Sequence, residues 1–525
     1  MKSCAAALAC AFVVFGACLR FRDAGQLVTR ADFNEHSRQD YYEYGRSLQE
    51  FGVLGWDGAP DAFRGVAYPA FLSWMETYDP AVRSRVPAAH ALLSSAVVPV
   101  AAAAAFGIGG LPAGAAAAAL AAFDPELRTS IGGCQVEIVF SLLIALVALA
   151  LVVWSAGPTI ANTLTLGLAI GTSLLCRSVL CLFPLVLVAA YWRKAEFVPT
   201  RRRWAWILLA SSYGLLSPWI VRNFVQFKRV IPFEDQAATR NLLAGALGIV
   251  DNNDAGNTQD YQDRLAARID PRGAAGPDRL AWLRRLAVER ILSRPGEYLR
   301  SCAKRLFYVL WNHAVVFIVS LAVVFWRRRE RGVQALALLC GYFVLVHVPM
   351  SVELRYFQPI VPCLLVLAAA AVPASAAEIP ERPAVAAVLA LTIPLCLLSF
   401  SRLAEEVALS KMPCALPASG IALYRCGQRQ DAAGHSAAAQ ASWDHALARL
   451  DRDRSYRPRL RARIIAESEA TRGVDRPERP ALLAQAAAEA PEELRQEALR
   501  LQDSHPAGAL RLFDALARAY PASAV

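Results

Sequence analysis

Residues 40–57 hold several carboxylates that could act as a general base. Asp40 opens a stretch whose tyrosine and apolar residues recur at helical spacing. These residues are Tyr41, Tyr44, Leu48 and Phe51. A carboxylate here could take a proton from a hydroxyl group, but Asp40 could equally cap the helix, which contributes about 1 kcal/mol. Spacing alone does not choose among Asp40, Glu43 and Asp57.

Four arginines stand beside long apolar runs, where a guanidinium could bind phosphate oxygens through two parallel hydrogen bonds. They are Arg64, Arg177, Arg222 and Arg355. An arginine at such an edge could instead extend toward lipid head groups. Glu137 likewise opens an apolar run, where the helix dipole by itself favours a carboxylate. Tyr68 and Trp219 could be interfacial aromatic residues.

The apolar runs predict an all-α polytopic membrane protein, because a helix needs about 20 apolar residues to cross the hydrocarbon core. We expect about eleven spans, and for any single run the alternative is a buried core helix. The spans lie near residues 3–19, 88–107, 110–123, 137–155, 159–175, 178–192, 204–220, 307–326, 333–350, 357–374 and 384–400.

The composition of the 525 residues agrees with this fold class. Hydrophobic residues make up 56% of the chain and charged residues 19%, against roughly 45–50% and about 25% in soluble proteins. A single soluble core is therefore excluded. The net charge of +11 would suggest nucleic acid in a soluble protein, but here the excess lies in short loops beside apolar runs, so we expect no nucleic-acid partner.

Lysine and arginine in short loops predict the orientation, since such loops resist translocation. Two loops are strongly basic, at residues 193–203 and 327–331. Placing both in the cytoplasm puts the N-terminus inside and residues 20–87, 221–306 and 401–525 outside. Alternatively, the first apolar run, which follows Lys2, is a cleaved signal peptide.

The exterior segments carry two further features. From Asp278 onward, leucines at helical spacing alternate with arginines up to Pro295, which predicts a basic amphipathic helix on the membrane surface. It could shape the entrance for an acceptor or merely anchor the loop. Most of the 12 cysteines lie in or beside apolar spans. Cys414 and Cys426 lie in the predicted exterior tail and could form a disulfide.

Residues 401–525 differ in composition from the preceding chain, being rich in Ala, Arg, Glu and Leu. Two stretches, residues 426–453 and 505–521, have the pattern of helix-turn-helix units and resemble tetratricopeptide-type hairpins. We therefore expect an exterior α-helical domain after residue 400. Such a domain could bind a protein partner or be a helical cap without one.

The order of motifs over residues 1–400 resembles bacterial GT-C glycosyltransferases, the group of protein O-mannosyltransferases and lipid A aminoarabinose transferases. The first exterior segment supplies Asp40, Tyr42, Gly52, Arg64, Tyr68 and Pro69. The later elements are Pro125 and Glu137; Gly167, Gly171 and Arg177; Pro218, Trp219, Arg222 and Asn223; Pro295 and Tyr298; and Arg355, Tyr356, Pro359 and Pro362.

The resemblance implies a membrane domain over residues 1–400 that transfers a sugar from a polyprenyl-phosphate donor to an exterior glycolipid, polysaccharide or protein. It selects Asp40 as the base and Arg355 as the first candidate for the donor phosphate, with Arg222, Arg64, Tyr68, Arg177 and Glu137 as further substrate-binding candidates. The implied location is the bacterial inner membrane, with the C-terminal domain in the periplasm.

The chain departs from the family at Asp40, which Tyr41 follows directly in place of a second acidic residue. A divalent cation would therefore need another oxygen ligand, such as Glu137 or Asp124. Two other functions remain open from the residues. A transporter or flippase of a lipid-linked glycan would favour ionisable groups inside the spans, where His347 is nearly alone. A non-catalytic envelope assembly protein would work through its C-terminal tail.

Overall fold

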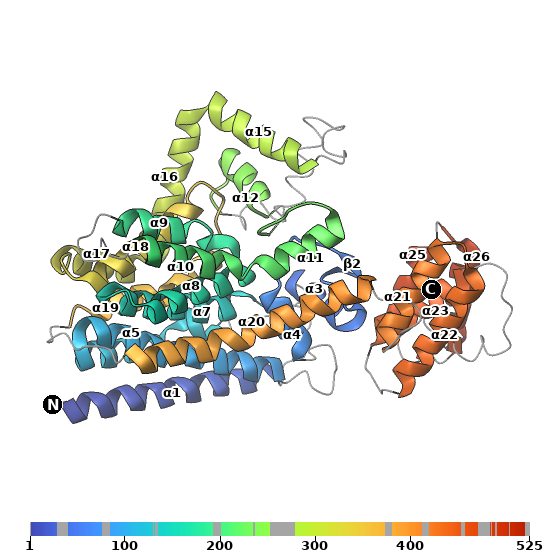
Figure 1. Cartoon of the computed structure of the whole chain (residues 1–525), viewed down its shortest axis with the longest axis horizontal. Helices are drawn as coiled ribbons and strands as arrows, with labels where there is room; N and C mark the ends of the chain where they lie inside the picture. Colours follow the sequence, from blue (N-terminus) through green and yellow to red (C-terminus); the bar gives the residue numbers. More distant parts are fainter. Residues whose placement is uncertain are drawn as a thin grey trace. The chain divides into compact units, whose positions relative to one another are not determined.

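The protein is almost entirely α-helical in the computed structural model (Figure 1). Two short strands form its one sheet within the part of the chain that is described. The described residues are 2–28, 40–75, 85–129, 131, 135–192, 201–234, 237–251, 279–372, 381–411, 419–452, 457–470, 483–484, 486–488, 491–502 and 504–519.

The chain divides into two compact units. The first contains residues 1–42, 61–75 and 81–400, and the second combines residues 43–60 with residues 401–525. The division therefore falls inside two helices, α3 (Asp40–Phe51) and α20 (Glu381–Lys411). Residues 43–60, which the sequence places in the first exterior segment of the membrane domain, belong to the same unit as the C-terminal helices.

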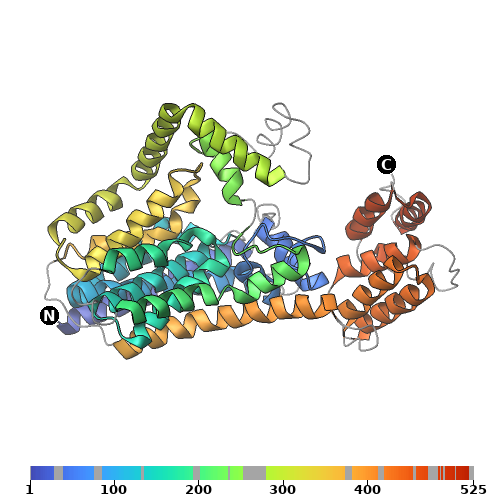
Figure 2. The same cartoon turned by 45° about the horizontal axis from the view of Figure 1, so that its top comes forward.

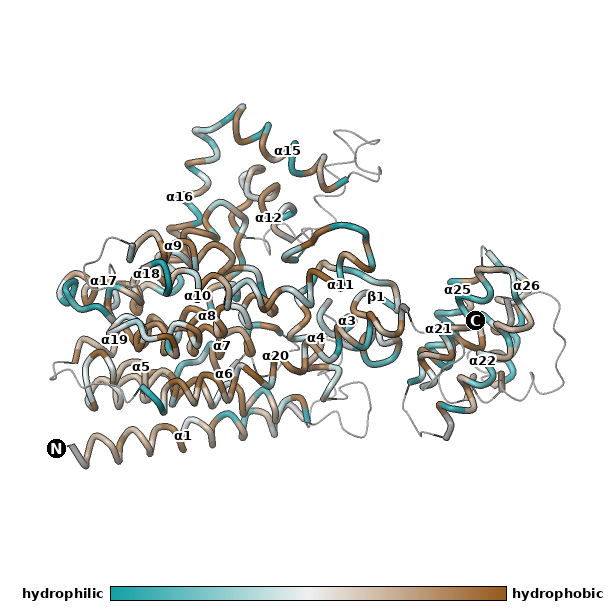
Figure 3. Tube along the Cα trace, in the orientation of Figure 1, coloured by the Kyte–Doolittle hydropathy of each residue, from teal (hydrophilic) through white to brown (hydrophobic). Residues whose placement is uncertain are grey.

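Helix α7 (Glu137–Ala156) lies at the centre of the first unit, and its apolar residues are buried along its whole length. It packs against α5, α8 and α18, and Figure 3 shows hydrophobic colouring along many helices of this unit. The surrounding helices are α5 (Arg85–Phe123), α8 (Ile160–Cys176), α18 (Arg331–His347) and α19 (Val361–Ala369). Two shorter elements follow α8, η2 (Ser178–Leu180) and α9 (Phe183–Tyr191).

Two glycines allow α8 to approach α10 (Arg201–Gly214) closely. A Cβ atom at Gly171 would lie 2.7 Å from a backbone oxygen of α10, and one at Gly167 would overlap the hydroxyl of Ser211. The glycine-rich stretch seen in the sequence is therefore a helix-packing surface. Small residues at such positions let two backbones come into contact.

Helix α5 is a hairpin of two antiparallel halves that turns at Gly109 and Gly110. A Cβ atom at Gly114 would lie 3.1 Å from the carbonyl oxygen of Ala102, whereas a straight helix would separate these residues by about 18 Å. The predicted spans at 88–107 and 110–123 are these two halves. Helix α1 (Lys2–Val28) packs along both, and Figures 1 and 2 show it beside α5.

A buried arginine connects α1 to the α5 hairpin. Arg20 donates to the Ser94 hydroxyl at 2.8 Å and to the carbonyl oxygen of Ala121 at 2.8 Å, at the end of the second half of α5. A cation at a helix C-terminus is favourable because the last carbonyls lack partners within the helix. Nearby, Arg128 pairs with Asp23 at 2.8 Å.

The predicted number of eleven spans is wrong. Among the described residues, four helices are long and apolar enough to cross a membrane, or up to six if each of two bent pairs is one span. The four are Cys4–Gln26, Arg85–Phe123, Glu137–Ala156 and Glu381–Leu409. Four of the other predicted spans form apolar helices of 10–17 residues, shorter than the roughly 20 residues that a span needs.

The remaining two predicted spans coincide with bent pairs. Helices α10 and α11 (Ser217–Phe227) meet at 42°, and α16 (Pro295–Asn312) meets α17 (Ala314–Trp326) at 96°. Hydropathy averaged over 307–326 does not detect the second break, which lies at His313. The apolar helices nonetheless indicate a membrane-associated protein, and exposed apolar residues line α16 and α17: Leu299, Phe307, Trp311, Val315 and Ile318.

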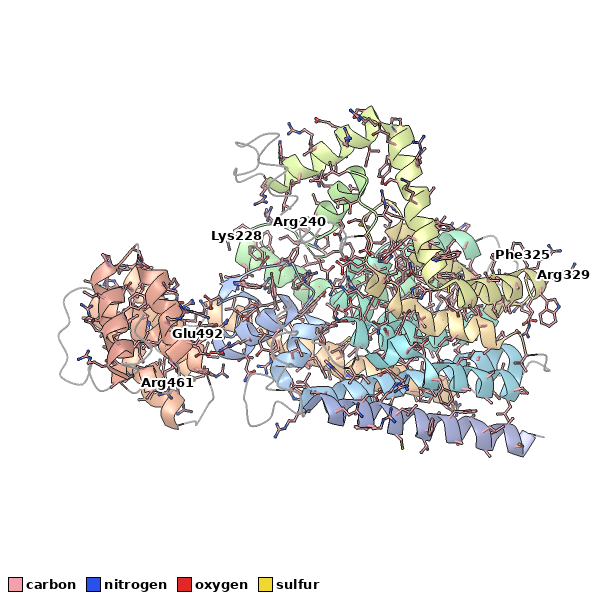
Figure 4. All side chains as sticks on the ribbon, turned by 180° about the vertical axis from the view of Figure 1, so that it is seen from behind. Lys228, Arg240, Phe325, Arg329, Arg461 and Glu492 are labelled. Atoms are coloured by element: carbon pink, nitrogen blue, oxygen red, sulfur yellow. The ribbon has the colours of Figure 1, made fainter. Side chains whose placement is uncertain are left out.

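The turn between α17 and α18 contains three consecutive arginines. Arg327 donates to the carbonyl oxygen of Ala370 at 2.7 Å and to that of Ile108 at 2.9 Å, and it pairs with Glu330 at 2.6 Å. Figure 4 labels Arg329 of this turn and Phe325, which lies near the end of α17. One of the two basic loops therefore also connects the ends of neighbouring helices.

The basic amphipathic stretch after Asp278 forms α15 (Arg279–Ser293), which ends just before Pro295 as expected. Its apolar stripe packs against α12 (Ala237–Ala246), where Leu283 and Ala287 are buried in a cluster with Leu243. These two residues of the stripe therefore contact protein, and the position of the helix on a membrane surface stays a prediction. Val288 and Leu292 of α15 are exposed.

The C-terminal part of the second unit is a stack of helices, drawn in orange and red in Figure 2. They are α21 (Gly420–Ala432), α22 (Ser436–Arg452), α23 (Pro458–Ala470), α25 (Pro491–Leu501) and α26 (Pro506–Ala519). Helices α21 and α22 form a hairpin that turns at Gly434, with a φ of 81°. Gly427 leaves space there for the indole of Trp443. This arrangement agrees with the predicted α-helical tail.

Cys426 is disulfide-bonded in α21. Cys414, the other half of the predicted pair, lies outside the described residues. A disulfide is typical of an oxidising, extracytoplasmic compartment. Nine other cysteines of the described chain are free, most of them in the apolar helices.

The α5 hairpin gives a test of the fold. Gly110 has φ 69° and ψ −164°, a region that is nearly restricted to glycine, so Gly110→Ala should destabilise the protein by about 1–3 kcal/mol. Thermal unfolding in detergent would measure the change. Gly341→Ala in α18 is the control, because a Cβ atom there meets no atom within 4 Å. Equal melting temperatures for the two variants would contradict the hairpin geometry.

Candidate functional site

Asp40 is the first residue of α3, as the sequence predicts for a residue at the start of a helix. Its side chain lies outside the described part of the structure. The next residue, Tyr41, is 4% exposed and belongs to the first unit. The geometry of the candidate site is therefore built from Tyr41 and the groups around it.

An ion pair between two neighbouring helices forms the centre of this region. Glu137 is the first residue of α7, and Arg177 directly follows the last residue of α8. The Arg177 Nη1 atom lies 2.9 Å from Glu137 Oε1, with the carboxylate side chain 3% exposed and the guanidinium side chain 14% exposed. Burial of a pair strengthens its attraction and raises the cost of breaking it.

The segment before α19 contributes a second charged group, in the 3-10 turn η4 (Leu354–Tyr356). Arg355 Nε lies 2.5 Å from Glu353 Oε2, and the Tyr356 hydroxyl donates to the same carboxylate at 2.9 Å. The Arg177 guanidinium lies over the Tyr356 ring, 5.0 Å from its centroid. Glu137 also attracts Arg355 electrostatically, so the two ion pairs belong to one cluster.

The third arginine, Arg64, reaches the cluster from the segment before α4 (Ala67–Trp74). Its guanidinium lies 4.8 Å from the centroid of the Tyr41 ring. Tyr41 in turn packs edge-on against Tyr68, with ring centroids 5.6 Å apart. The Tyr68 hydroxyl lies 3.1 Å from His90 Nε2, a fully buried group of α5.

Glu234 connects two parts of this region. One oxygen accepts from the backbone N–H of Gly65 at 3.3 Å, and the other accepts from the Ser178 hydroxyl at 3.2 Å. Gly65 itself lies against the end of α8, since a Cβ atom there would be 2.6 Å from the carbonyl oxygen of Leu175 and 2.7 Å from that of Cys176. Backbone contact at Gly65 thus places Arg64 beside Arg177.

The buried polar atoms of the cluster that have no hydrogen-bond partner among the described residues include the hydroxyl oxygen of Tyr41 and Oε2 of Glu137. Burial raises the pKa of Tyr41 well above its usual value; Arg64 and Arg177 act in the opposite sense, and Glu234 and Glu137 add to the increase. The hydroxyl therefore stays protonated at neutral pH. Leaving such groups unpaired costs about 1–3 kcal/mol each.

The cluster is formally neutral, with three arginines and three glutamates: Arg64, Arg177, Arg355, Glu137, Glu234 and Glu353. The cluster thus contains arginines that pair with glutamates. It also contains the Tyr41 hydroxyl and the Glu137 Oε2 atom, which form no hydrogen bond with the described residues. Such a cluster can bind an anionic, oxygen-rich ligand through rearranged charge-assisted hydrogen bonds. Of the predicted site residues, the structure brings together Arg355, Arg177, Arg64 and Glu137, with Tyr68 adjoining through Tyr41.

Arg222 contacts the backbone beside the charged cluster. It is fully buried in α11, where it donates to the carbonyl oxygen of Asp61 at 2.7 Å and to the side chain of Asn223 at 2.9 Å. Asn223 donates to the carbonyl oxygen of Ile231 at 2.9 Å. These contacts hold the backbone just before Arg64 and just before Glu234, and the predicted role of Arg222 in substrate binding stays a prediction.

A second buried arginine supports the segment that carries Glu353 and Arg355. Arg305 of α16 donates to the carbonyl oxygens of Val348 at 2.7 Å and Gly245 at 2.7 Å. A Cβ atom at Gly245 would lie 2.5 Å from a backbone oxygen of the same segment. The long loop 221–306 thus fixes the approach to the site from the α19 side.

Sequence reasoning missed several members of the cluster. In the sequence, Tyr41 is one residue of a helical stripe, and the family motif contains the neighbouring Tyr42 instead. Glu234 and Glu353 stand in loops with no periodicity to distinguish them, and His90 lies inside an apolar run. An ionisable residue within an apolar run is the one signal that points to function, and it applies to His90.

No group of three or more His, Cys, Asp or Glu side chains arranged to hold a metal ion occurs among the residues that the structure describes. Glu137, one of the two additional ligands considered for a divalent cation, is paired with Arg177. The other, Asp124, accepts from the backbone N–H of Leu127 at 2.9 Å, at the start of α6 (Pro125–Thr129).

Comparison of the chain with protein-family models, with curated proteins and with solved structures gives no significant match.

The contact at Gly65 gives a test of the site geometry. Gly65→Ala should shift the Arg64 segment away from the end of α8, because two carbonyl oxygens occupy the space of the new methyl group. We expect a loss of about 1–3 kcal/mol in unfolding free energy. The matched control is Gly25→Ala in α1, where a Cβ atom meets nothing within 4 Å. Unchanged thermal unfolding of Gly65→Ala would contradict the close backbone approach.

Proposed function

We propose that this protein is an integral-membrane glycosyltransferase of the GT-C type that moves a sugar from a polyprenyl-phosphate donor to an acceptor outside the cytoplasm. The main support is the buried cluster around Arg177, in which Tyr41 and Glu137 each keep one polar atom that pairs with none of the described residues. The apolar helices give it a bilayer setting. The motif order along residues 1–400 gives the reaction class.

The donor phosphate would be bound by Arg177 and Arg355. Arg177 pairs with Glu137 at 2.9 Å, and Arg355 pairs with Glu353 at 2.5 Å. A planar guanidinium presents several N–H donors in a fork that matches phosphate oxygens. The glutamates would keep both arginines in place for the donor. The protonated hydroxyl of Tyr41 would donate a further hydrogen bond, and Arg64 would add positive charge from the other side of the Tyr41 ring.

The transfer itself requires a base and a stabilised leaving group. The Asp40 carboxylate would take the proton from the acceptor hydroxyl, whose oxygen then forms a bond to the anomeric carbon of the sugar. The bond between that carbon and the phosphate oxygen breaks, and polyprenyl phosphate leaves with the electron pair. Arginines near the phosphate stabilise the charge that develops there. A divalent cation could assist, with Glu137 as one ligand.

The orientation completes the proposal. The N-terminus would lie in the cytoplasm of a bacterial cell, and the C-terminal domain would lie in the periplasm. The disulfide at Cys426 supports an oxidising environment for that domain. The acceptor would be a glycolipid, a polysaccharide or a protein at the outer face of the inner membrane.

Mass spectrometry of surface glycans from cells with and without the protein tests this function directly. The expected result is the loss of one sugar from a defined acceptor, restored by the wild-type gene. Identical glycans in both strains, together with no transfer from polyprenyl-phosphate sugars in membranes, would contradict the proposal.

Substitution of the proposed base tests the mechanism. Asp40→Asn keeps the size and the capping ability of the side chain but removes the basic oxygen, so transfer should fall by about 10²–10⁴-fold. Insertion and thermal unfolding should stay as in the wild type. Asp514→Asn, at an exposed position of α26, is the control and should transfer normally. Retained transfer in the Asp40 variant would remove this residue from the mechanism.

Substitution of Tyr41 should increase the stability of the protein and decrease its transfer activity. Tyr41→Phe removes a buried hydroxyl that has no hydrogen-bond partner in the described part of the chain, so the ligand-free protein should gain up to about 1–3 kcal/mol in unfolding free energy. Transfer should fall about tenfold because the donor phosphate loses one hydrogen bond. Denaturant unfolding and a transfer assay on the same preparation measure both. A variant that is less stable and fully active would show that the hydroxyl serves the fold.

A further inference from the structure

The C-terminal helices enclose a segment from far upstream in the chain. Phe51 and Val53 belong to the same buried apolar core as Leu409 and Tyr424. The Phe51 ring is 1% exposed, and its centroid lies 6.4 Å from that of Tyr424. Gly52 turns the chain here with φ 63°, and a Cβ atom at this position would lie 2.6 Å from Leu409 Cδ1. This segment is therefore part of the domain core.

Glu50 completes a C-terminal helix. Its carboxylate accepts from the backbone N–H of Leu460 at 3.1 Å, in the first turn of α23. Free N–H groups and the helix dipole both favour an anion at this position. Arg46, one turn earlier in α3, pairs with the other oxygen of Glu50 at 2.7 Å and with Glu493 of α25 at 3.0 Å. The upstream segment thus supplies the cap of α23 and an ion pair to α25.

Arginines of the C-terminal helices bind the remaining acidic and backbone groups of the segment. Arg463 lies 2.5 Å from Asp57 and 2.6 Å from Glu497, and Arg459 lies 2.7 Å from Glu43. Glu497 and Asp57 raise the pKa of Arg463 above its usual value, although burial by itself lowers it. The cationic face of α23 thus matches the acidic residues of the segment.

The bound segment ends in a tight hairpin that fits the same face. Strands β1 (Gly55–Trp56) and β2 (Ala59–Pro60) pair antiparallel. Asp57 and Gly58 form the turn, with φ 51° and 79°, values that suit a two-residue hairpin turn. Arg463 donates to the Asp57 carbonyl oxygen at 3.1 Å, and Arg425 donates to that of Gly58 at 3.2 Å. The domain thus recognises the backbone of the turn as well as its charge.

We propose that the C-terminal helical domain is a receptor for residues 43–60 of its own chain. The ligand is an acidic, aromatic segment that docks within the same molecule, so this face is not a recruitment site for another protein.

Cleavage within the intact protein tests the docking. A site for a specific protease is placed between Lys411 and Ser419 of the full chain in lipid nanodiscs, and cleavage is done with the disulfide reduced. We expect the fragment that begins at Ser419 to stay with the nanodisc. Glu50→Ala combined with Phe51→Ala should release at least ten times more of it. Release from the wild type, or equal retention in the variant, would overturn the proposal.

A second test uses conservative substitutions, because the double alanine variant could misfold. Glu43→Gln and Arg459→Gln should each increase hydrogen exchange of residues 43–60, and the double variant should exchange no faster than either single one, because both remove the same ion pair. The control pair is Glu492→Gln with Arg495→Gln, two exposed residues of α25 that pair at 2.9 Å, and it should leave this exchange unchanged. Additive increases in the first pair would contradict the docking.

Fragment retention and hydrogen exchange need no substrate, so they decide the docking even if wild-type membranes show no sugar transfer.

Discussion

The buried ion pair between Glu137 and Arg177 is the interaction on which the first unit depends. It joins the start of the fully buried helix α7 to the end of α8. Arg177 then provides a surface for Tyr356, and Glu137 attracts Arg355. Removing either partner would leave a charge buried without compensation, which is far more costly than losing an exposed pair. The pair therefore fixes the ends of two apolar helices and the charge distribution between them.

Glycines determine how closely the other elements approach this pair. Gly65 touches the end of α8, Gly171 touches α10, and Gly245 touches the segment that leads to Glu353. Each position excludes even one methyl group on backbone grounds. Because glycine has no side chain, the backbones approach each other closely at these three positions. This close approach brings the charged groups together. Arg222 and Arg305 then bind the carbonyl oxygens of the same segments.

Much of the architecture could be predicted from the sequence. Apolar runs bounded by charge or proline coincide with helices from α1 to α20, and the composition after residue 400 indicated the helical tail. The number of spans could not be predicted, because hydropathy averages across the bend at His313. Hydropathy also does not distinguish a helix that crosses a bilayer from a shorter one buried in protein.

The candidate site shows the same limits. Arg177, Arg355 and Glu137 were found because charges at the edges of apolar runs are unusual. Glu234 and Glu353 were missed, since loop carboxylates gain their meaning only from tertiary contacts. The packing of Phe51 into the C-terminal core was missed for the same reason, because several hundred residues separate the partners in sequence. Local patterns carry no information about pairs at this separation.

Arg327 affects how the topology of this protein can be studied. Its guanidinium binds carbonyl oxygens at the ends of α19 and of the first half of α5, where it compensates two helix dipoles. Replacing Arg327 in order to invert the membrane orientation would therefore also damage helix packing. The effect on orientation could then not be separated from a folding defect. Arg328 and Arg329, both exposed in the same turn, carry the same charge without these contacts. Substitutions that test the role of positive charge in membrane orientation should therefore be made at Arg328 and Arg329.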